Sequence, residues 1–319
     1  MATAKAKNAK KSGAKNITRV KASEAKTVDT VEATKTTKVK TKSSKGAKKC
    51  KFFARKFDGS ENILTIFKDT KILGAILGEV IGTGLISALA FTLGLANPLY
   101  WVFAYVGVTL AVFKLSGAHL NPAITAGMMA SRRISAIRGV LYIIAQVIGA
   151  WAGFMIISGF HSAGVASGNI DATTAALPTL QGAADATAQT EGYSFFWAYT
   201  MIEFIGAIII SFFFARGLSY KKKPIVFAAT VAFGIFLALS FAVLINQSFF
   251  YNAGNSFTLN PALSLMFGIF PGSAESFGAL MGALMPMVVT YIVFPVLGGV
   301  LGFYLSDFAS CLKGDKLAE

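Results

Sequence analysis

Long apolar stretches alternate with short polar segments along most of this chain. Six stretches approach or exceed the length that a helix needs to cross a bilayer, which is about 20 residues within a range near 17–25. They span residues 72–95, 99–115, 136–160, 195–215, 224–245 and 279–305. The pattern predicts an all-α membrane protein with six transmembrane helices.

Two further apolar segments are too short to cross. Residues 121–130 and 260–270 each offer roughly half of the length that a spanning helix needs. Segments of this length are typical of re-entrant half-helices, which enter the membrane without crossing it. Their backbone survives there only where protein buries it or where it lines a wet cavity.

The two halves of the chain resemble each other. Residues 77–82 place Glu79 in the first span, and residues 201–206 place Glu203 in the fourth span within a similar sequence. Each half then runs through a second span, a half-helix and a third span, over about 70–160 and 194–306. Because three crossings is an odd number, the second half enters from the opposite face. The sequence therefore predicts an inverted repeat with its site near the midplane.

Composition and charge separate a tail from this body. The chain is 54% hydrophobic and 14% charged, against roughly 25% charged residues in a soluble domain. Residues 1–56 hold 16 Lys, 2 Arg, 2 Glu and 1 Asp, which equals the whole chain's net charge of +15. We expect residues 1–56 to be a disordered basic cytoplasmic tail. It is interpreted as a solvated topogenic arm, a segment attracted to anionic lipid headgroups or, least favoured, a nucleic-acid-binding segment. We expect no nucleic-acid partner.

The positive-inside rule orients the predicted channel domain, residues 57–306. With the tail inside, the outer segments 94–98, 161–193 and 246–259 carry no Lys or Arg, whereas each inner loop carries several. Both termini, including a short C-terminal segment 307–319, are therefore predicted to be cytoplasmic. The protein itself is predicted to lie in the cell membrane. Cys50 and Cys311 fall on that side, where we expect no structural disulfide.

The tripeptide Asn-Pro-Ala occurs twice, as Asn121, Pro122 and Ala123 and as Asn260, Pro261 and Ala262. A lone Asn-Pro usually marks a turn, but here the motif opens both short apolar segments. Asn is a good helix cap, and Pro is favoured at the first helical position. The two half-helices enter from opposite faces, so their N-termini are predicted to meet at mid-membrane with both asparagine amides facing a lumen.

Two facing helix N-termini, each carrying about half a positive charge, would form a barrier to cations and protons. A neutral molecule with an acceptor oxygen could instead accept hydrogen bonds from both amides. The pattern favours passive conduction. We expect no enzyme activity, cofactor or metal, since the sequence offers no nucleophile, metal set or acid–base pair in a suitable pattern.

Residues 116–125, Ser-Gly-Ala-His-Leu-Asn-Pro-Ala-Ile-Thr, resemble the first signature of the major intrinsic protein family, the aquaporins and glycerol facilitators. Glu79, Glu203 and the pair Ala145-Gln146 also fit, over roughly residues 70–306. The resemblance implies an aquaporin-like right-handed bundle and a homotetramer with one pore per subunit. It implies that Glu79 and Glu203 brace the re-entrant loops by accepting backbone N–H bonds, although each charge could be paired elsewhere. His119 would line the path through its backbone carbonyl, or be only a packed imidazole.

The resemblance also implies a four-residue selectivity filter. Counting from the motifs gives Trp101, Phe257 and Leu263, and the fourth position falls on Phe241 or, by another count, Ser248; we favour Phe241. Trp101 and Phe257 resemble the residues of glycerol facilitators, although Trp101 could instead belong to an interfacial belt. Leu263 departs from the arginine usual in the family, which removes a cation and a fork of donors.

Three functions remain open at this point. The first is a channel in the lipid bilayer for water or small neutral solutes such as glycerol. The second is a channel of altered selectivity, for ammonia, peroxide, gases or ions, and Leu263 motivates it. The third is a non-conducting structural membrane protein, which the bulky apolar rim would suit because an apolar constriction can dewet and close.

Overall fold

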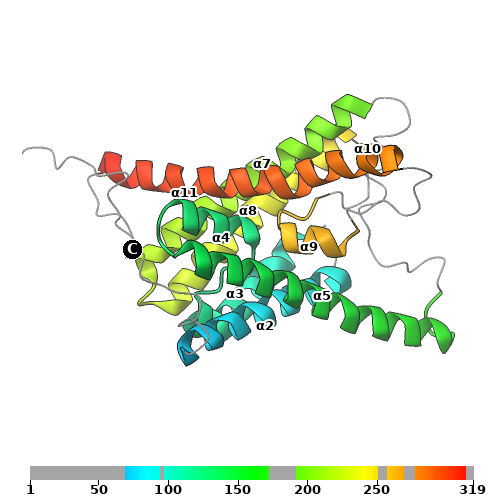
Figure 1. Cartoon of the computed structure of the whole chain (residues 1–319), viewed down its shortest axis with the longest axis horizontal. Helices are drawn as coiled ribbons and strands as arrows, with labels where there is room; N and C mark the ends of the chain where they lie inside the picture. Colours follow the sequence, from blue (N-terminus) through cyan, green and yellow to red (C-terminus); the bar gives the residue numbers. More distant parts are fainter. Residues whose placement is uncertain (1–68, 94–96, 172–191, 251–256, 269–276, 314–319) are drawn as a thin grey trace, which may run out of the picture. The chain divides into compact units, whose positions relative to one another are not determined.

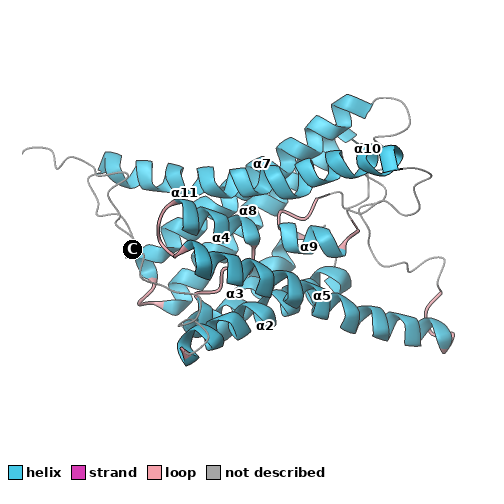
Figure 2. Ribbon diagram, in the orientation of Figure 1, coloured by secondary structure: helices cyan, strands magenta, loops and turns pink. Residues whose placement is uncertain are grey.

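The computed structural model describes residues 69–93, 97–171, 192–250, 257–268 and 277–313, and this part of the chain contains helices and loops without strands (Figure 2). The basic segment 1–56 and the C-terminal residues 314–319 lie outside it. The helices are α2 (Thr70–Leu93), α3 (Pro98–Ser116), α4 (Pro122–Ala130), α5 (Ala136–Ala166), α7 (Gly192–Gly217), η1 (Leu218–Tyr220), α8 (Pro224–Phe250), α9 (Pro261–Met266), α10 (Phe277–Val288), η2 (Val289–Val293) and α11 (Phe294–Lys313).

Six helical segments of the described chain are long and apolar enough to cross a membrane. They coincide with the six predicted spans, so the prediction of an all-α membrane protein is confirmed. The short helices α4 and α9 begin at Pro122 and Pro261, where the sequence predicts half-helices. The C-terminal ends of two helices differ more from the predicted spans: α5 continues to Ala166 and α8 to Phe250.

The sixth span is interrupted near its start. Pro286 lies inside α10, where it has no N–H to donate to the preceding turn. The π-helical turn η2 follows directly, and α11 then continues to Lys313. A wider turn beside a proline accommodates the missing bond without ending the helix. Consequently, α11 continues to Lys313, and the cytoplasmic position of residues 307–319 stays a prediction.

The two repeats have matching helix contacts. In the first, α2 packs against α5 and α3; in the second, α7 packs against α11 and α8. The half-helices are exchanged, because α4 packs extensively against α11 of the second repeat and α9 packs against α5 of the first. Figure 1 shows α4 and α9 among the long helices. Each repeat therefore supplies part of the seat for the other's half-helix.

Glycines allow the closest helix approaches in both repeats. A Cβ atom on Gly149 of α5 would overlap the carbonyl oxygen of Val80 on α2, and one on Gly298 of α11 would overlap that of Phe204 on α7. Small residues let backbones pack this closely in membrane proteins. The equivalent crossings of the two repeats thus use the same device.

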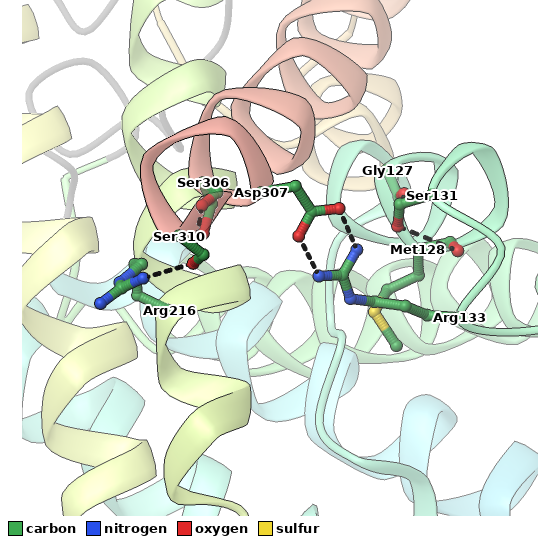
Figure 3. Close-up of polar contacts among 8 residues, drawn as sticks. All are labelled: Gly127, Met128, Ser131, Arg133, Arg216, Ser306, Asp307 and Ser310. Atoms are coloured by element: carbon green, nitrogen blue, oxygen red, sulfur yellow. Dashed lines mark hydrogen bonds and ion pairs between the residues drawn. The ribbon is translucent and has the colours of Figure 1, made fainter. Parts of the chain in front are cut away.

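Polar contacts join the loop after α4 to α11 (Figure 3). The Arg133 guanidinium donates to both carboxylate oxygens of Asp307, at 2.7 and 3.3 Å, and lies 5.2 Å from the centre of the Phe303 ring. One turn further along α11, Ser310 accepts a 2.7 Å hydrogen bond from Arg216 of α7. The Arg133 contacts tie the base of the first half-helix to the second repeat, and the bond between Arg216 and Ser310 joins two helices of that repeat.

Cys311 is disulfide-bonded in the structure, so the expectation that this chain forms no structural disulfide is wrong. The chain has two cysteines, and the other, Cys50, lies outside the described residues. The expectation relied on the redox state of a compartment, which does not determine the state of an individual cysteine.

Candidate pore

The two asparagines of the repeated motif cap the half-helices. Asn121 has an extended backbone and its side-chain oxygen accepts from the Ala123 N–H at 2.8 Å. Asn260 does the same for Ala262 at 3.1 Å. In both cases proline occupies the next position, where its missing N–H leaves no orphan donor. The motif therefore starts each helix abruptly.

Each asparagine also reaches across to the opposite motif. Asn121 Nδ2 donates to the carbonyl oxygen of Leu259 at 2.8 Å, and Asn260 Nδ2 donates to that of Leu120 at 2.9 Å. These reciprocal bonds join residues that are 138 and 140 positions apart in the sequence. The half-helix N-termini therefore face each other across the contact between repeats.

The residue before each asparagine has an unusual backbone. Leu120 and Leu259 both have φ of 55°, in the left-handed region that disfavours a bulky side chain. Two buried carboxylates hold these loops in place. Glu79 accepts from the N–H groups of His119 and Leu120 at 2.9 and 2.8 Å. An intramembrane carboxylate needs such partners. The same hydrogen bonds hold the strained loop in its conformation.

Glu203 holds the second loop through the same kind of contacts. It accepts from the backbone N–H groups of Thr258 and Leu259 at 2.6 and 3.0 Å. The two sites differ in their third partner. Gln146 of α5 donates its amide to Glu79 at 2.7 Å and to Thr125 at 2.9 Å. On the other side the Thr258 hydroxyl lies beside Glu203 and bonds to Ser264.

His119 is enclosed by the first repeat and α7. Its Nδ1 lies 3.2 Å from the Thr125 hydroxyl, and the ring meets Tyr142 and Phe214 edge to face. Its backbone N–H is the donor to Glu79. These contacts describe a packed imidazole whose main chain belongs to the braced loop, and the role of its backbone carbonyl in lining the path stays a prediction.

A small cavity lies beside the second motif, and the space in it that the centre of a water molecule can reach is about 10 Å³. It is lined by Trp101 and Tyr105 of α3, Ile210 of α7, Ile235 and Leu239 of α8, and Thr258, Leu259 and Leu263 around the motif. Two of the predicted filter residues, Trp101 and Leu263, thus come together. Trp101 is 1% exposed, so its ring packs inside the protein rather than in a belt at the lipid surface.

The other two predicted filter residues do not line this cavity. Phe257 is buried next to Thr258, and Phe241 is half-buried on α8. The lining residue from α8 closest to Phe241 in sequence is Leu239. Counting along a loop of unusual length cannot determine the register of a helix face, whereas Leu239 lies one turn after Ile235 and shares its face.

Tyr105 and the bracing role of Gln146 do not follow from the motif alone. Tyr105 lies four residues after Trp101, and residues at that spacing share one face of a helix. The rings of Trp101 and Tyr105 are 5.9 Å apart. Extending the predicted filter by one helical turn would have included Tyr105.

Comparisons with known proteins give the family of this chain. The family described as major intrinsic protein matches residues 66–305. The lens fiber major intrinsic protein of Lithobates pipiens is 29% identical over 79% of this chain and 92% of its own length. A glycerol uptake facilitator protein-like 6 from Lactiplantibacillus plantarum is 27% identical over 76% of this chain and 90% of its own.

Among solved structures, the aquaglyceroporin from Plasmodium falciparum aligns with 75% of this chain and 96% of its own, at 18% identity and a TM-score of 0.47. The match of the family to most of the chain, together with six spans and paired motifs, identifies an integral multi-pass membrane protein. The chain belongs to the major intrinsic protein family, the channels for water and small solutes.

Proposed function

We propose that this chain conducts water and small neutral solutes such as glycerol passively, along a path between Asn121 and Asn260. The observation that carries the proposal is the reciprocal pair of amide bonds, Asn121 to Leu259 and Asn260 to Leu120. It fixes two helix N-termini against each other, each worth about half a positive charge. A cation would meet this field without compensation, while a neutral solute would not.

The cavity supports a narrow and largely apolar entrance. Its side chains are aromatic or aliphatic apart from the hydroxyls of Tyr105 and Thr258. An apolar wall suits the carbon skeleton of a small polyol, and a few polar groups suffice to orient it. We assign the filter to Trp101, Leu263, Phe257 and a residue of α8, for which Leu239 has better support than Phe241.

The test is swelling and shrinking of proteoliposomes that contain the full chain, followed by light scattering under osmotic and glycerol gradients. Water permeability should exceed that of empty liposomes, with a low activation energy. An entrapped pH dye should report no added proton leak. Permeability equal to empty liposomes for both water and glycerol would overturn the proposal.

A second candidate function is conduction with altered selectivity, such as passage of ammonia, peroxide, dissolved gases or ions. Leu263 favours it, because it places a buried aliphatic side chain in the cavity wall and no fixed cation there. Ammonia flux above water flux in the same liposomes would support this alternative. A non-conducting structural role would be supported if no solute passed.

We further propose a homotetramer in the cell membrane with both termini in the cytoplasm. The charge pattern supports the orientation, since Arg132, Arg133 and residues 221–223 lie between spans on one side. We retain residues 1–56 as a basic tail outside the channel domain 57–306. Native mass spectrometry and accessibility of tags at the two ends would test the assembly and the orientation.

A further inference from the structure

Tyr105 occupies a position in the cavity that the motif-based assignment leaves without a role. It lies one turn after Trp101 on α3, lines the same cavity and is nearly fully buried. It shares this cavity with Thr258 and Leu259, and its side chain lies beside Asn260, the asparagine of the second motif. An aromatic side chain thus reaches from a spanning helix to the capping residue of a half-helix.

The surroundings of the two asparagines differ for this reason. Within the described chain, the Asn121 side chain donates to Leu259 and accepts from Ala123. Asn260 makes the equivalent bonds to Leu120 and from Ala262, and the Tyr105 side chain lies beside it. An asparagine amide carries two hydrogens, so one N–H of Asn121 remains available to a solute. At Asn260 the phenol takes a position that a solute would otherwise occupy.

The geometry points to Tyr105 as the residue that determines which solutes pass from the cavity to the paired asparagines. Its ring limits the cross-section of the path, and its hydroxyl replaces the Asn260 amide as the group offered to the solute. A phenol hydroxyl both donates and accepts, so it serves a solute that offers either a donor or an acceptor. This inference rests on the proposed path between Asn121 and Asn260.

The class of solute follows from these groups. A molecule crossing here meets the Tyr105 hydroxyl, one Asn121 N–H and walls formed by Ile210 and Ile235. Water satisfies both polar groups and fits beside the ring. A longer polyol must move the ring or lose bonds between its hydroxyls and water, because the aliphatic walls offer no replacement. Tyr105 therefore sets a size limit in addition to the filter at Trp101 and Leu263.

The experiment compares Tyr105→Val and Tyr105→Phe with the wild type in proteoliposomes, using water, glycerol and the four-carbon polyol erythritol. Phe103→Val is the matched control, because it removes a ring from the exposed face of the same helix. Monodisperse elution and equal protein per liposome are required of each variant, and Tyr105→Leu substitutes for Tyr105→Val if the latter does not fold.

We expect Tyr105→Val to raise erythritol permeability by about tenfold or more relative to the control, which corresponds to about 1.4 kcal/mol of barrier. Tyr105→Phe keeps the ring, so it should retain the exclusion of erythritol while changing the flux of water. A wild-type solute profile in Tyr105→Val, with water flux intact in both proteins, would overturn this inference alone.

The remaining outcomes separate the two proposals. If the wild type conducts nothing and Tyr105→Val conducts, the native chain is closed by Tyr105; the inference stands and the proposed conduction by the wild type fails. If neither conducts, both are overturned.

Discussion

The Arg133 guanidinium and the Asp307 carboxylate form a buried ion pair at 2.7 Å between the base of the first half-helix and the last helix of the chain (Figure 3). Their side chains are 1% and 4% exposed. Water cannot replace the partner of either charge. Removing one partner therefore costs more stability than the intact pair contributes.

Asp307→Asn should destabilise the protein by roughly 3–5 kcal/mol, because it leaves the Arg133 charge buried without its counter-charge. Thermal unfolding in detergent measures the change. The double variant Arg133→Met/Asp307→Leu should recover much of the loss, since no charge then remains buried. Arg132→Asn is the control: it removes a neighbouring exposed cation at a backbone with φ of 56°, which asparagine tolerates. Equal stability of Asp307→Asn and the wild type would contradict this account.

Replacing the bracing carboxylates should damage the loops unequally. Glu79→Gln and Glu203→Gln each present one carbonyl oxygen where two N–H groups need acceptors, which costs about 1–3 kcal/mol for a group left unsatisfied. Glu79→Gln also turns its new amide toward Gln146, so we expect it to lose more stability and more conduction. Osmotic permeability and thermal unfolding are both measured.

The control for both glutamates is Asp69→Asn, which removes an exposed carboxylate at the start of α2. It should leave conduction unchanged. If Glu203→Gln proved more harmful than Glu79→Gln, the additional bonds of Gln146 would not be what distinguishes the two loops.

Leu263→Arg should shift selectivity from polyols toward water. The change adds a cation and five N–H donors to the cavity wall beside Trp101. The path becomes narrower, and less apolar wall remains for the carbon skeleton of a polyol. We expect the ratio of glycerol to water permeability to fall. Leu263→Met, a change of shape without charge, should keep the wild-type ratio; a ratio that is the same in all three proteins would remove Leu263 from the filter.

Two glycine substitutions should have opposite effects on stability. Gly149→Ala inserts a methyl group against the Val80 carbonyl where α2 meets α5, and overpacking of this kind costs typically about 1–3 kcal/mol. Gly107→Ala on α3 meets nothing within 4 Å, so the better helix propensity of alanine should add up to about 1 kcal/mol. Thermal unfolding of the two variants side by side tests this, and destabilisation of Gly107→Ala would contradict it.

The topology follows from the sequence because length and repetition are sufficient to specify it. Six apolar stretches and two half-length segments have few possible arrangements in a bilayer, where every backbone group must be paired. The starts of α4 and α9 were also predictable, since Asn-Pro is a helix-starting pair in this context. The end of the last span was not, because the polar residues Ser306 and Asp307 suggest that the apolar span stops there, whereas α11 continues to Lys313.

Side-chain partners that depend on tertiary contacts could not be read from the motifs. Arg133 is one of a set of inner-loop cations in the sequence, and nothing local shows that it pairs with Asp307. Phe241 stays a prediction for the fourth filter position, since counting residues does not fix which face of α8 meets the cavity that Leu239 lines. Tyr105 was within reach of simple helical spacing, since it shares a face with Trp101.

The exchange of half-helices between repeats has a consequence for biosynthesis. Helix α4 is made early, but its seat on α11 emerges only with the last residues of the chain. Until then, helix α4 and Arg133, which is buried in the complete protein, lack their partners on α11. Helix α9 differs, because its partner α5 has already been synthesised when α9 is made. The first repeat can therefore reach its final packing only after α11 has been synthesised.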